Sequence, residues 1–279
     1  MTPACGSPPS TPTAAQPAEP VEVDWREPVA FDFRERISAH VSVLGVRAGS
    51  FDFEVAPSCR GDHPTVELRS KMSTVGLVRF FKATDGIAET TMDPARARPL
   101  ASELVILDGD VTRRYRALHR PGAVETTFSR TGSPPKHKNV RIAGGEHALD
   151  MQSAFLLLRY WRADAGSEGY FYVLLGRSLW RVTVHHFGQK TLELQEQRRP
   201  ALLLTGVARR LKSSADTGDD TRRFSMWLSP DATRTPLKVE GDASFGKVMM
   251  ELSAREVDRS EPGICAVLNA KLSRQVNPT

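Results

Sequence analysis

The pair His185-His186 is the first place where this sequence could support metal or acid–base chemistry, because histidine is a common metal ligand and general base. The surrounding alternation of apolar and polar residues predicts a strand, in which adjacent side chains point to opposite faces. His186 then shares an apolar face with Val182 and Val184, and His185 lies on the polar face. We therefore interpret His186 as a core histidine rather than a metal ligand.

Two other motifs that could bind ions have simpler structural explanations. Asp108-Gly109-Asp110 lacks the further spaced oxygens of a calcium loop and predicts a hairpin turn. Gly144-Gly145 is not followed by the Lys-Ser/Thr pair of a phosphate-binding loop, and no serine lies in a Gly-x-Ser-x-Gly motif. The sequence indicates no catalytic residue, no metal site and no cofactor, and we expect a protein that is not an enzyme.

The cysteines leave two questions open. Cys5 lies among small residues at the start of a Pro-, Ala-, Ser- and Thr-rich stretch that runs to Pro20, as in a bacterial lipoprotein just after its signal peptide. The apolar segment of a signal peptide does not precede it in the given chain, so Cys5 is either a lipid anchor or an incidental residue of a tail. Cys59 and Cys265 lie in predicted loops. They are either free thiols or a disulfide formed in an oxidising compartment, which would stabilise the fold by about 3–5 kcal/mol.

Charge and hydropathy exclude some partners. The net charge of +5 over 279 residues comes mainly from arginines scattered along the chain, whereas a nucleic-acid binder concentrates its charge. The densest basic segment, residues 136–141, follows two prolines and is interpreted as a solvated loop, so nucleic acid is not an expected partner. No apolar run approaches the ~18 residues of a membrane span, and membrane association is expected only through a lipid anchor.

Most of the chain has the alternation and turn chemistry of antiparallel strands. Residues 37–43 and 49–55 form a predicted hairpin around Gly45, with apolar residues on one face of each strand. Further strands are predicted at residues 66–73, 86–92, 100–107, 112–118, 124–129, 170–175, 179–187, 190–196, 201–211, 222–228, 237–240 and 247–255.

Two apolar segments predict helices. Residues 75–81 are apolar on too many sides for an edge strand and predict one or two helical turns that fill the core. Asp150 can cap a helix over residues 151–161, whose faces are nearly all apolar, so this helix is expected to lie buried across the sheet.

The predicted organisation is a disordered Pro-rich linker or tether at residues 1–24, a single β-rich domain at 25–257 and a partly helical C-terminal tail at 258–279. The fold class is mainly β. A meander of this length predicts a strongly curved antiparallel sheet, a half-barrel or open barrel, with one or two short helices packed in its concave face.

Large apolar side chains gather around the two predicted helices and the second half of the sheet. They form either a filled core or the walls of a cavity for a hydrophobic ligand, and the sequence does not distinguish the two. The candidate cavity residues are Phe80, Phe81, Met151, Ala154, Phe155, Leu158, Trp161, Tyr172, Trp180 and Trp227.

Five segments in order resemble an uncharacterised bacterial cell-envelope family, a domain of unknown function. They are residues 44–49, 72–90, 98–100, 150–155 with Arg159, and 227–252, and the resemblance covers about residues 29–254. It implies a shape similar to the lipoprotein carriers LolA and LolB, with helices in the concave face of a curved sheet. It implies no catalytic residues.

Together these observations predict a non-enzymatic protein of the cell envelope that binds a lipid or other hydrophobic ligand. The expected location is the periplasm, or the outer membrane through Cys5, and the cytoplasm if no signal peptide precedes the chain. The alternative is a scaffold or assembly factor with a filled core, which binds an envelope protein partner. The ligand, the partner and the oligomeric state do not follow from the sequence.

Overall fold

The computed structural model describes residues 21–23, 33–61, 63–76, 79, 83–142, 147–211, 220–243 and 246–259. Several predicted features lie outside these residues. They are Cys5, most of the linker at 1–24, most of the helical turns at 75–81 with Phe80 and Phe81, and the tail beyond residue 259 with Cys265.

The described strands form one 16-stranded sheet in the order β1-β11-β12-β13-β14-β15-β16-β2-β3-β4-β5-β6-β7-β8-β9, with β10 also paired to β11. All neighbours are antiparallel except β1 and β10, which run parallel to β11. The bounds are β1 Val21–Glu22, β2 Arg34–Val43, β3 Val46–Arg60, β4 His63–Thr74, β5 Thr84–Asp93, β6 Arg98–Asp108, β7 Val111–Arg120, β8 Ala123–Arg130, β9 Ser133–Arg141, β10 Ala148–Asp150, β11 Glu168–Leu175, β12 Ser178–Leu194, β13 Gln197–Arg210, β14 Thr221–Leu228, β15 Pro236–Ala243 and β16 Gly246–Asp258.

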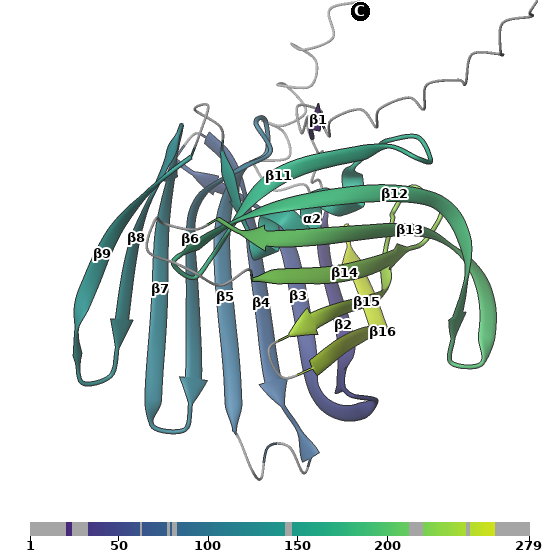
Figure 1. Ribbon diagram of the computed structural model, residues 1–279, viewed down its shortest axis with the longest axis horizontal. Helices are drawn as coiled ribbons and strands as arrows, with labels where there is room; N and C mark the ends of the chain where they lie inside the picture. The colour runs from purple at the N-terminus through teal and green to yellow at the C-terminus, as the bar shows by residue number, and fades with distance from the viewer. Residues whose placement is uncertain are drawn as a thin grey trace, which may run out of the picture.

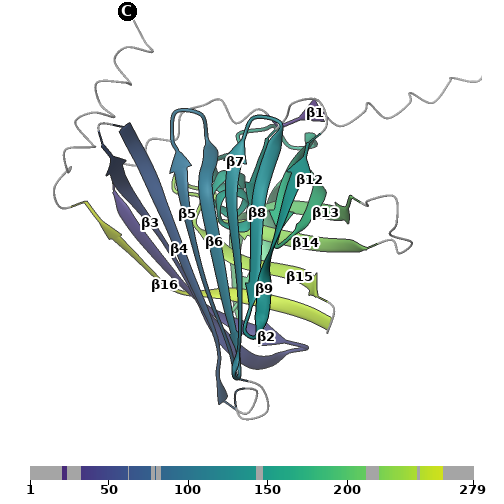
Figure 2. The ribbon, with the colours of Figure 1, turned by 90° about the vertical axis from the view of Figure 1, so that its left-hand side faces the viewer.

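The sheet curls strongly and does not close, which confirms the predicted fold class (Figure 1). Its two ends overlap: side chains on β11 and β12, such as Leu174 and Leu179, pack with Ala117 and Val124 of β7 and β8. The β7 side chain of His119 also reaches across to β10, with Nδ1 3.0 Å from the carbonyl oxygen of Ala148. Figure 2 shows β7 and β8 standing in front of the strands at the other end of the sheet. The sheet is therefore rolled into a spiral.

The predicted first hairpin is confirmed by β2 and β3. Ile37, Ala39 and Val41 of β2 are buried, and the residues between them are more exposed, as alternation requires. The turn is tighter than expected, at Leu44-Gly45, where both residues have positive φ. Gly49 is needed for a close approach, because a Cβ atom there would lie 2.6 Å from the backbone oxygen of Ser73.

The predicted helix is confirmed as α2, Met151–Tyr160, within one residue at its C-terminal end. Asp150 caps it by accepting hydrogen bonds from the backbone N–H groups of Gln152 and Ser153, and Ser153 Oγ accepts one from the Asp150 N–H. Leu156 and Leu157 are fully buried in the largest core cluster, which also includes Phe53 and other side chains of β2–β5 and β11–β14. The helix thus fills the inside of the spiral.

Some predictions about local structure are wrong. The basic segment at 136–141 belongs to edge strand β9 rather than to a loop, and Pro134 and Pro135 are tolerated there because an edge strand has one row of unpaired backbone groups. The predicted strands at 179–187 and 190–196 are one long strand, β12, with an irregularity between His186 and Gln189. Val21 and Glu22 pair with β11 in parallel.

Candidate functional site

The principal candidate site is a pocket of about 530 Å³ inside the spiral, between α2 and strands β11–β16, which we call the helix pocket. The helix contributes Met151, Ala154, Phe155 and Leu158 to one wall. The facing strands contribute mainly apolar or small side chains: Phe171, Val173, Leu175, Trp180, Val182, Ala208, Phe224, Met226, Val239, Gly241, Ala243, Val248 and Met250. A concave, mostly apolar cavity of this size is typical of a small-molecule site.

The structure brings five of the predicted cavity residues together around the helix pocket: Met151, Ala154, Phe155, Leu158 and Trp180. The wall formed by β13–β16 was not predicted, although the alternation of apolar and polar residues in these strands indicates which side chains face inward. Ala208 of β13 and Gly241 of β15 have too little side chain to look like ligand contacts, yet their small size keeps the space open.

The structure places three predicted residues away from the helix pocket. Tyr172 and Trp227 lie between inward-facing neighbours on their strands and therefore point to the opposite face. Tyr172 packs against the apolar cluster between the overlapping ends of the sheet. The ring centre of Trp227 lies 5.4 Å from the ammonium nitrogen of Lys238. Trp161 is buried just past the end of α2, edge-on to His186 with ring centres 6.1 Å apart.

The C-terminal end of α2 is held by a buried ion cluster of Glu35 with Arg159 and Arg255, which no local sequence pattern indicates. Arg159 donates two hydrogen bonds to the Glu35 carboxylate, at 2.6 and 3.0 Å, and Arg255 donates a third at 2.7 Å. Glu35 and Arg159 are almost completely buried. Arg159 also donates to the backbone oxygens of Thr233 and Arg234, so all three guanidinium nitrogens are used.

Burial alone raises the pKa of Glu35, but hydrogen bonds and charges from Arg159 and then Arg255 outweigh it, and the pKa is lowered below 4.5. The carboxylate is therefore ionised in the folded protein. The cluster ties α2 to β2, β16 and the β14–β15 turn, which fixes the helix over the pocket.

The N-terminal end of α2 is held by a second buried network. Thr90 of β5 donates to the Asp150 carboxylate at 3.0 Å and accepts from the Gln152 amide at 3.0 Å. Nearby, burial lowers the pKa of His119 despite the opposing effects of Asp150 and the Ala148 carbonyl. A neutral His119 fits this network, because its Nδ1 contacts the carbonyl and its Nε2 lies 3.1 Å from Ser102 Oγ.

His186 is buried in the core, as predicted from the strand pattern. Its Nδ1 accepts a hydrogen bond from the Gly188 N–H, and within the described parts of the chain its Nε2 has no partner. Burial and the nearby Arg234 charge lower the pKa of His186, so the ring stays neutral. Among the described residues no three His, Cys, Asp or Glu side chains gather closely enough to hold a metal ion.

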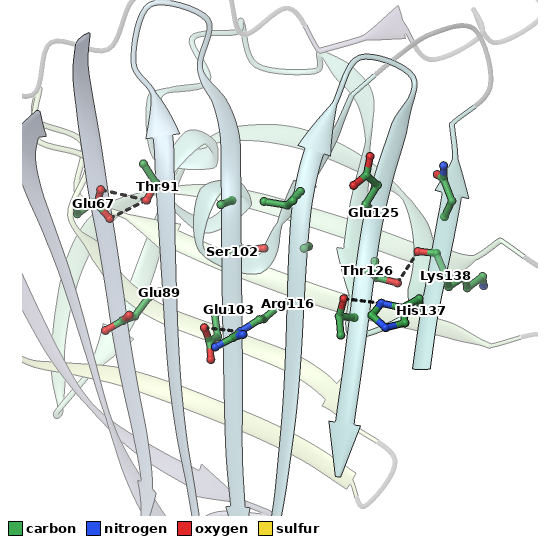
Figure 3. A pocket seen from close by; sticks show the side chains of 15 residues that line it. Glu67, Glu89, Thr91, Ser102, Glu103, Arg116, Glu125, Thr126, His137 and Lys138 are labelled. Carbon is green, nitrogen blue, oxygen red and sulfur yellow. Dashed lines mark hydrogen bonds and ion pairs between the residues drawn. The ribbon is translucent and has the colours of Figure 1, made fainter. Parts of the chain in front are cut away.

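A second hollow of about 660 Å³, which we call the outer groove, lies across β4–β9 (Figure 3). The strand register places Glu67, Thr91, Ala101 and Leu118 on one face, opposite the buried Leu68. The carboxylates of the groove are engaged across strands: Glu67 with Thr91, Glu89 with Arg69, Glu103 with Arg114 and Arg116, and Glu125 with Arg120. Such pairs stabilise the outer face of the sheet.

Cys59 lies in strand β3 and not in the predicted loop, and it is disulfide-bonded. Because Cys265 lies outside the described residues, the predicted pairing of these two cysteines stays a prediction. Within the described chain, α2 is too short to cross a membrane and no other helix qualifies.

Comparison with known proteins identifies the family of this chain and a solved structure with a similar fold. The profile of the family described as "Protein of unknown function (DUF3108)" matches residues 36–253, most of the chain. The chain belongs to the DUF3108 family. No curated protein matches this DUF3108 chain. The predicted resemblance to a domain of unknown function is confirmed, and the likeness in shape to LolA and LolB stays a prediction.

A solved structure described as a "Beta-barrel-like Protein of Domain of Unknown Function DUF1849 from Brucella abortus" is similar to this DUF3108 chain, with a TM-score of 0.54 and 13% sequence identity. The match covers 82% of this chain and 99% of that chain. At this level of identity the similarity shows the fold alone. It shows that a bacterial protein of a differently described family shares the β-barrel-like architecture.

Proposed function

We propose that this protein binds one lipid or other hydrophobic ligand in the helix pocket and acts without catalysis. The observation that carries the proposal is the pocket itself, an apolar space between α2 and six strands that the surrounding side chains leave open. Both ends of α2 are held by buried polar networks, so the helix that forms one wall is rigidly placed. A preformed apolar cavity binds an apolar ligand with little cost in ordering the protein.

The size of the pocket favours a single chain. A volume of about 530 Å³ lies within the range of roughly 300–1,000 Å³ that is typical of small-molecule sites. One long acyl chain is a ligand of this size class. The proposed ligand is therefore a single-chain lipid or one acyl chain of a larger molecule.

We also propose a location in the bacterial cell envelope. The disulfide at Cys59 supports an oxidising compartment, since disulfides are rare in the bacterial cytoplasm. The Pro-rich segment that begins near Cys5 supports a tether, with or without a lipid on that cysteine. Cell fractionation, with labelling of protein-bound lipid, tests both: a cytoplasmic pool of reduced protein contradicts this location.

Binding is tested with N-phenyl-1-naphthylamine, an uncharged apolar fluorophore whose emission rises in apolar surroundings. The wild-type protein should bind one equivalent saturably. Ala208→Leu and Ala154→Trp, which fill the pocket from a strand and from the helix, should weaken binding at least tenfold. Ala101→Leu is the matched control, because it adds the same volume as Ala208→Leu on the outer groove.

Thermal unfolding of each variant separates loss of the pocket from loss of the fold. Equal binding by wild type and both filled variants contradicts the proposal. Absence of saturable binding by the folded wild-type protein also contradicts it, and favours the scaffold or assembly factor with protein partners.

A further inference from the structure

One end of the helix pocket opens to solvent, and we call this end the mouth. Met151 and Leu175 both line the pocket, yet 55% and 44% of their surfaces are exposed. The pairing of Asp150 with Leu174 places them beside each other, at the start of α2 and the end of β11. Large apolar side chains exposed at a cavity entrance mark a route for an apolar ligand.

The strand ends on the mouth side of β11–β16 are basic. The described segments 175–180, 208–211, 220–223, 240–243 and 246–248 carry three carboxylates, Asp220, Glu240 and Asp242. The same segments carry six cations: Arg177, Arg209, Arg210, Arg222, Arg223 and Lys247. A cleft with a surplus of one sign of charge around low-dielectric walls attracts ligands of the opposite sign.

Two cations line the helix pocket, Arg222 and Arg223, beside the carboxylates of Glu240 and Asp242. Glu240 is paired with Lys238 at 2.7 Å. Arg222 lies on the same face of β14 as Phe224 and Met226. Its guanidinium contacts Asp220 at 3.0 Å through one nitrogen, and both side chains are more than one-third exposed. Because a guanidinium has five N–H donors, this single contact leaves donors for a second anion.

Arg177 lies at the end of β11 but does not line the helix pocket, because its guanidinium packs against β8. It lies in the β11–β12 turn, two residues beyond Leu175, with its guanidinium 5.8 Å from the ring of Phe128. The Lys138 ammonium group donates to the Arg177 backbone oxygen at 3.4 Å, which brings a further cation to the turn. Among the described residues, the buried Nε of Arg177 has no hydrogen-bond partner.

We propose that the mouth binds an anionic head group, so that the ligand is a single-chain amphiphile whose carboxylate or phosphate contacts Arg222 while its chain fills the helix pocket. This inference rests on the proposed function and adds the charge of the ligand. The apolar volume selects the chain, and the basic strand ends select the head.

The test uses displacement of N-phenyl-1-naphthylamine by four C14 probes below their micelle concentrations: tetradecanoate, tetradecyl phosphate, tetradecanol and tetradecyltrimethylammonium. Both anions should bind at least tenfold more tightly than the cation, the size of effect that one charge-assisted hydrogen bond produces. The preference should shrink as salt is raised, because the mouth is partly exposed. The ratio between the two anions distinguishes a carboxylate head from a phosphate head.

The variant R222Q tests this residue. It should reduce the anion-to-cation ratio of affinities at least threefold. Arg69→Gln, an exposed arginine paired with Glu89 on the outer groove, is the matched control and should leave the ratio unchanged. Equal displacement by all four probes overturns the anionic head group while the proposed function stands. Failure of the fluorophore itself to bind overturns both.

Discussion

The Glu35 cluster gives the sharpest prediction about stability. Glu35→Gln keeps the size of the side chain but leaves the fully buried guanidinium of Arg159 without its carboxylate. Removing one partner of a buried ion pair typically costs about 3–5 kcal/mol, because the other charge stays buried and uncompensated. At about 2–4 °C per kcal/mol for a domain of this size, the melting temperature should fall by roughly 6–20 °C.

The assay is urea unfolding followed by circular dichroism, with Arg36→Gln as the control. Arg36 adjoins Glu35 on β2 but points outward, where its 3.7 Å contact with Asp52 is largely exposed. A surface pair of this kind contributes about 0–1 kcal/mol. The reasoning is refuted if Glu35→Gln costs no more than Arg36→Gln.

The same cluster predicts a pH dependence. Because the pKa of Glu35 is lowered in the folded protein, its contribution is fully present above the unfolded value near 4.5 and is lost as the pH falls through the folded value. The free energies of unfolding of wild type and Glu35→Gln should therefore approach each other on acidification below pH 4.5. A constant difference down to strongly acidic pH contradicts this assignment.

Three further predictions concern the cap of α2 and strands β3, β5 and β7. Asp150→Ala should lower the free energy of unfolding by about 1–2 kcal/mol in urea titrations, because the helix cap and the Thr90 contact are lost; Asp150→Asn, which keeps an acceptor, should cost less, and equal costs would contradict the capping role. Gly49→Ala should destabilise the sheet, because the new Cβ atom would clash with the Ser73 backbone oxygen. Gly86→Ala is its control: the new Cβ atom would lie 3.9 Å from Met72, and the free energy of unfolding should change by less than about 0.5 kcal/mol. Because the pKa of His119 is lowered in the folded protein, the unfolded chain binds the proton first, and the protein should lose stability as the pH falls below about 6.5. Thermal melts at a series of pH values test this. The same dependence of melting temperature on pH in wild type and His119→Asn would contradict it.

Local patterns in the sequence predict much of this fold, because alternation, turns and caps are encoded by neighbouring residues. The hairpin of β2 and β3 and the Asp150 cap are examples. The edge strand β9 was missed, because prolines and lysines are typical of both loops and exposed edges.

Contacts between distant parts of the chain cannot be predicted from such local patterns. Glu35 and Arg159 are separated by 124 positions, and each looks like a surface residue on its own element. Alternation shows that Tyr172 and Trp227 have a buried side, but not which layer covers it. The spiral overlap decides this, since it covers the face of β11 that bears Tyr172, away from the helix pocket. The small residues Ala208 and Gly241 matter through the space they leave, which only the assembled fold defines.

The central claim is that the helix pocket holds one single-chain ligand. Native mass spectrometry of protein purified gently from its own cells tests it most directly, with Ala208→Leu purified in parallel. The account predicts a 1:1 adduct with the mass of one single-chain amphiphile on the wild-type protein and its loss from the variant. A folded wild-type protein that carries no adduct and takes up none of the C14 probes would contradict it.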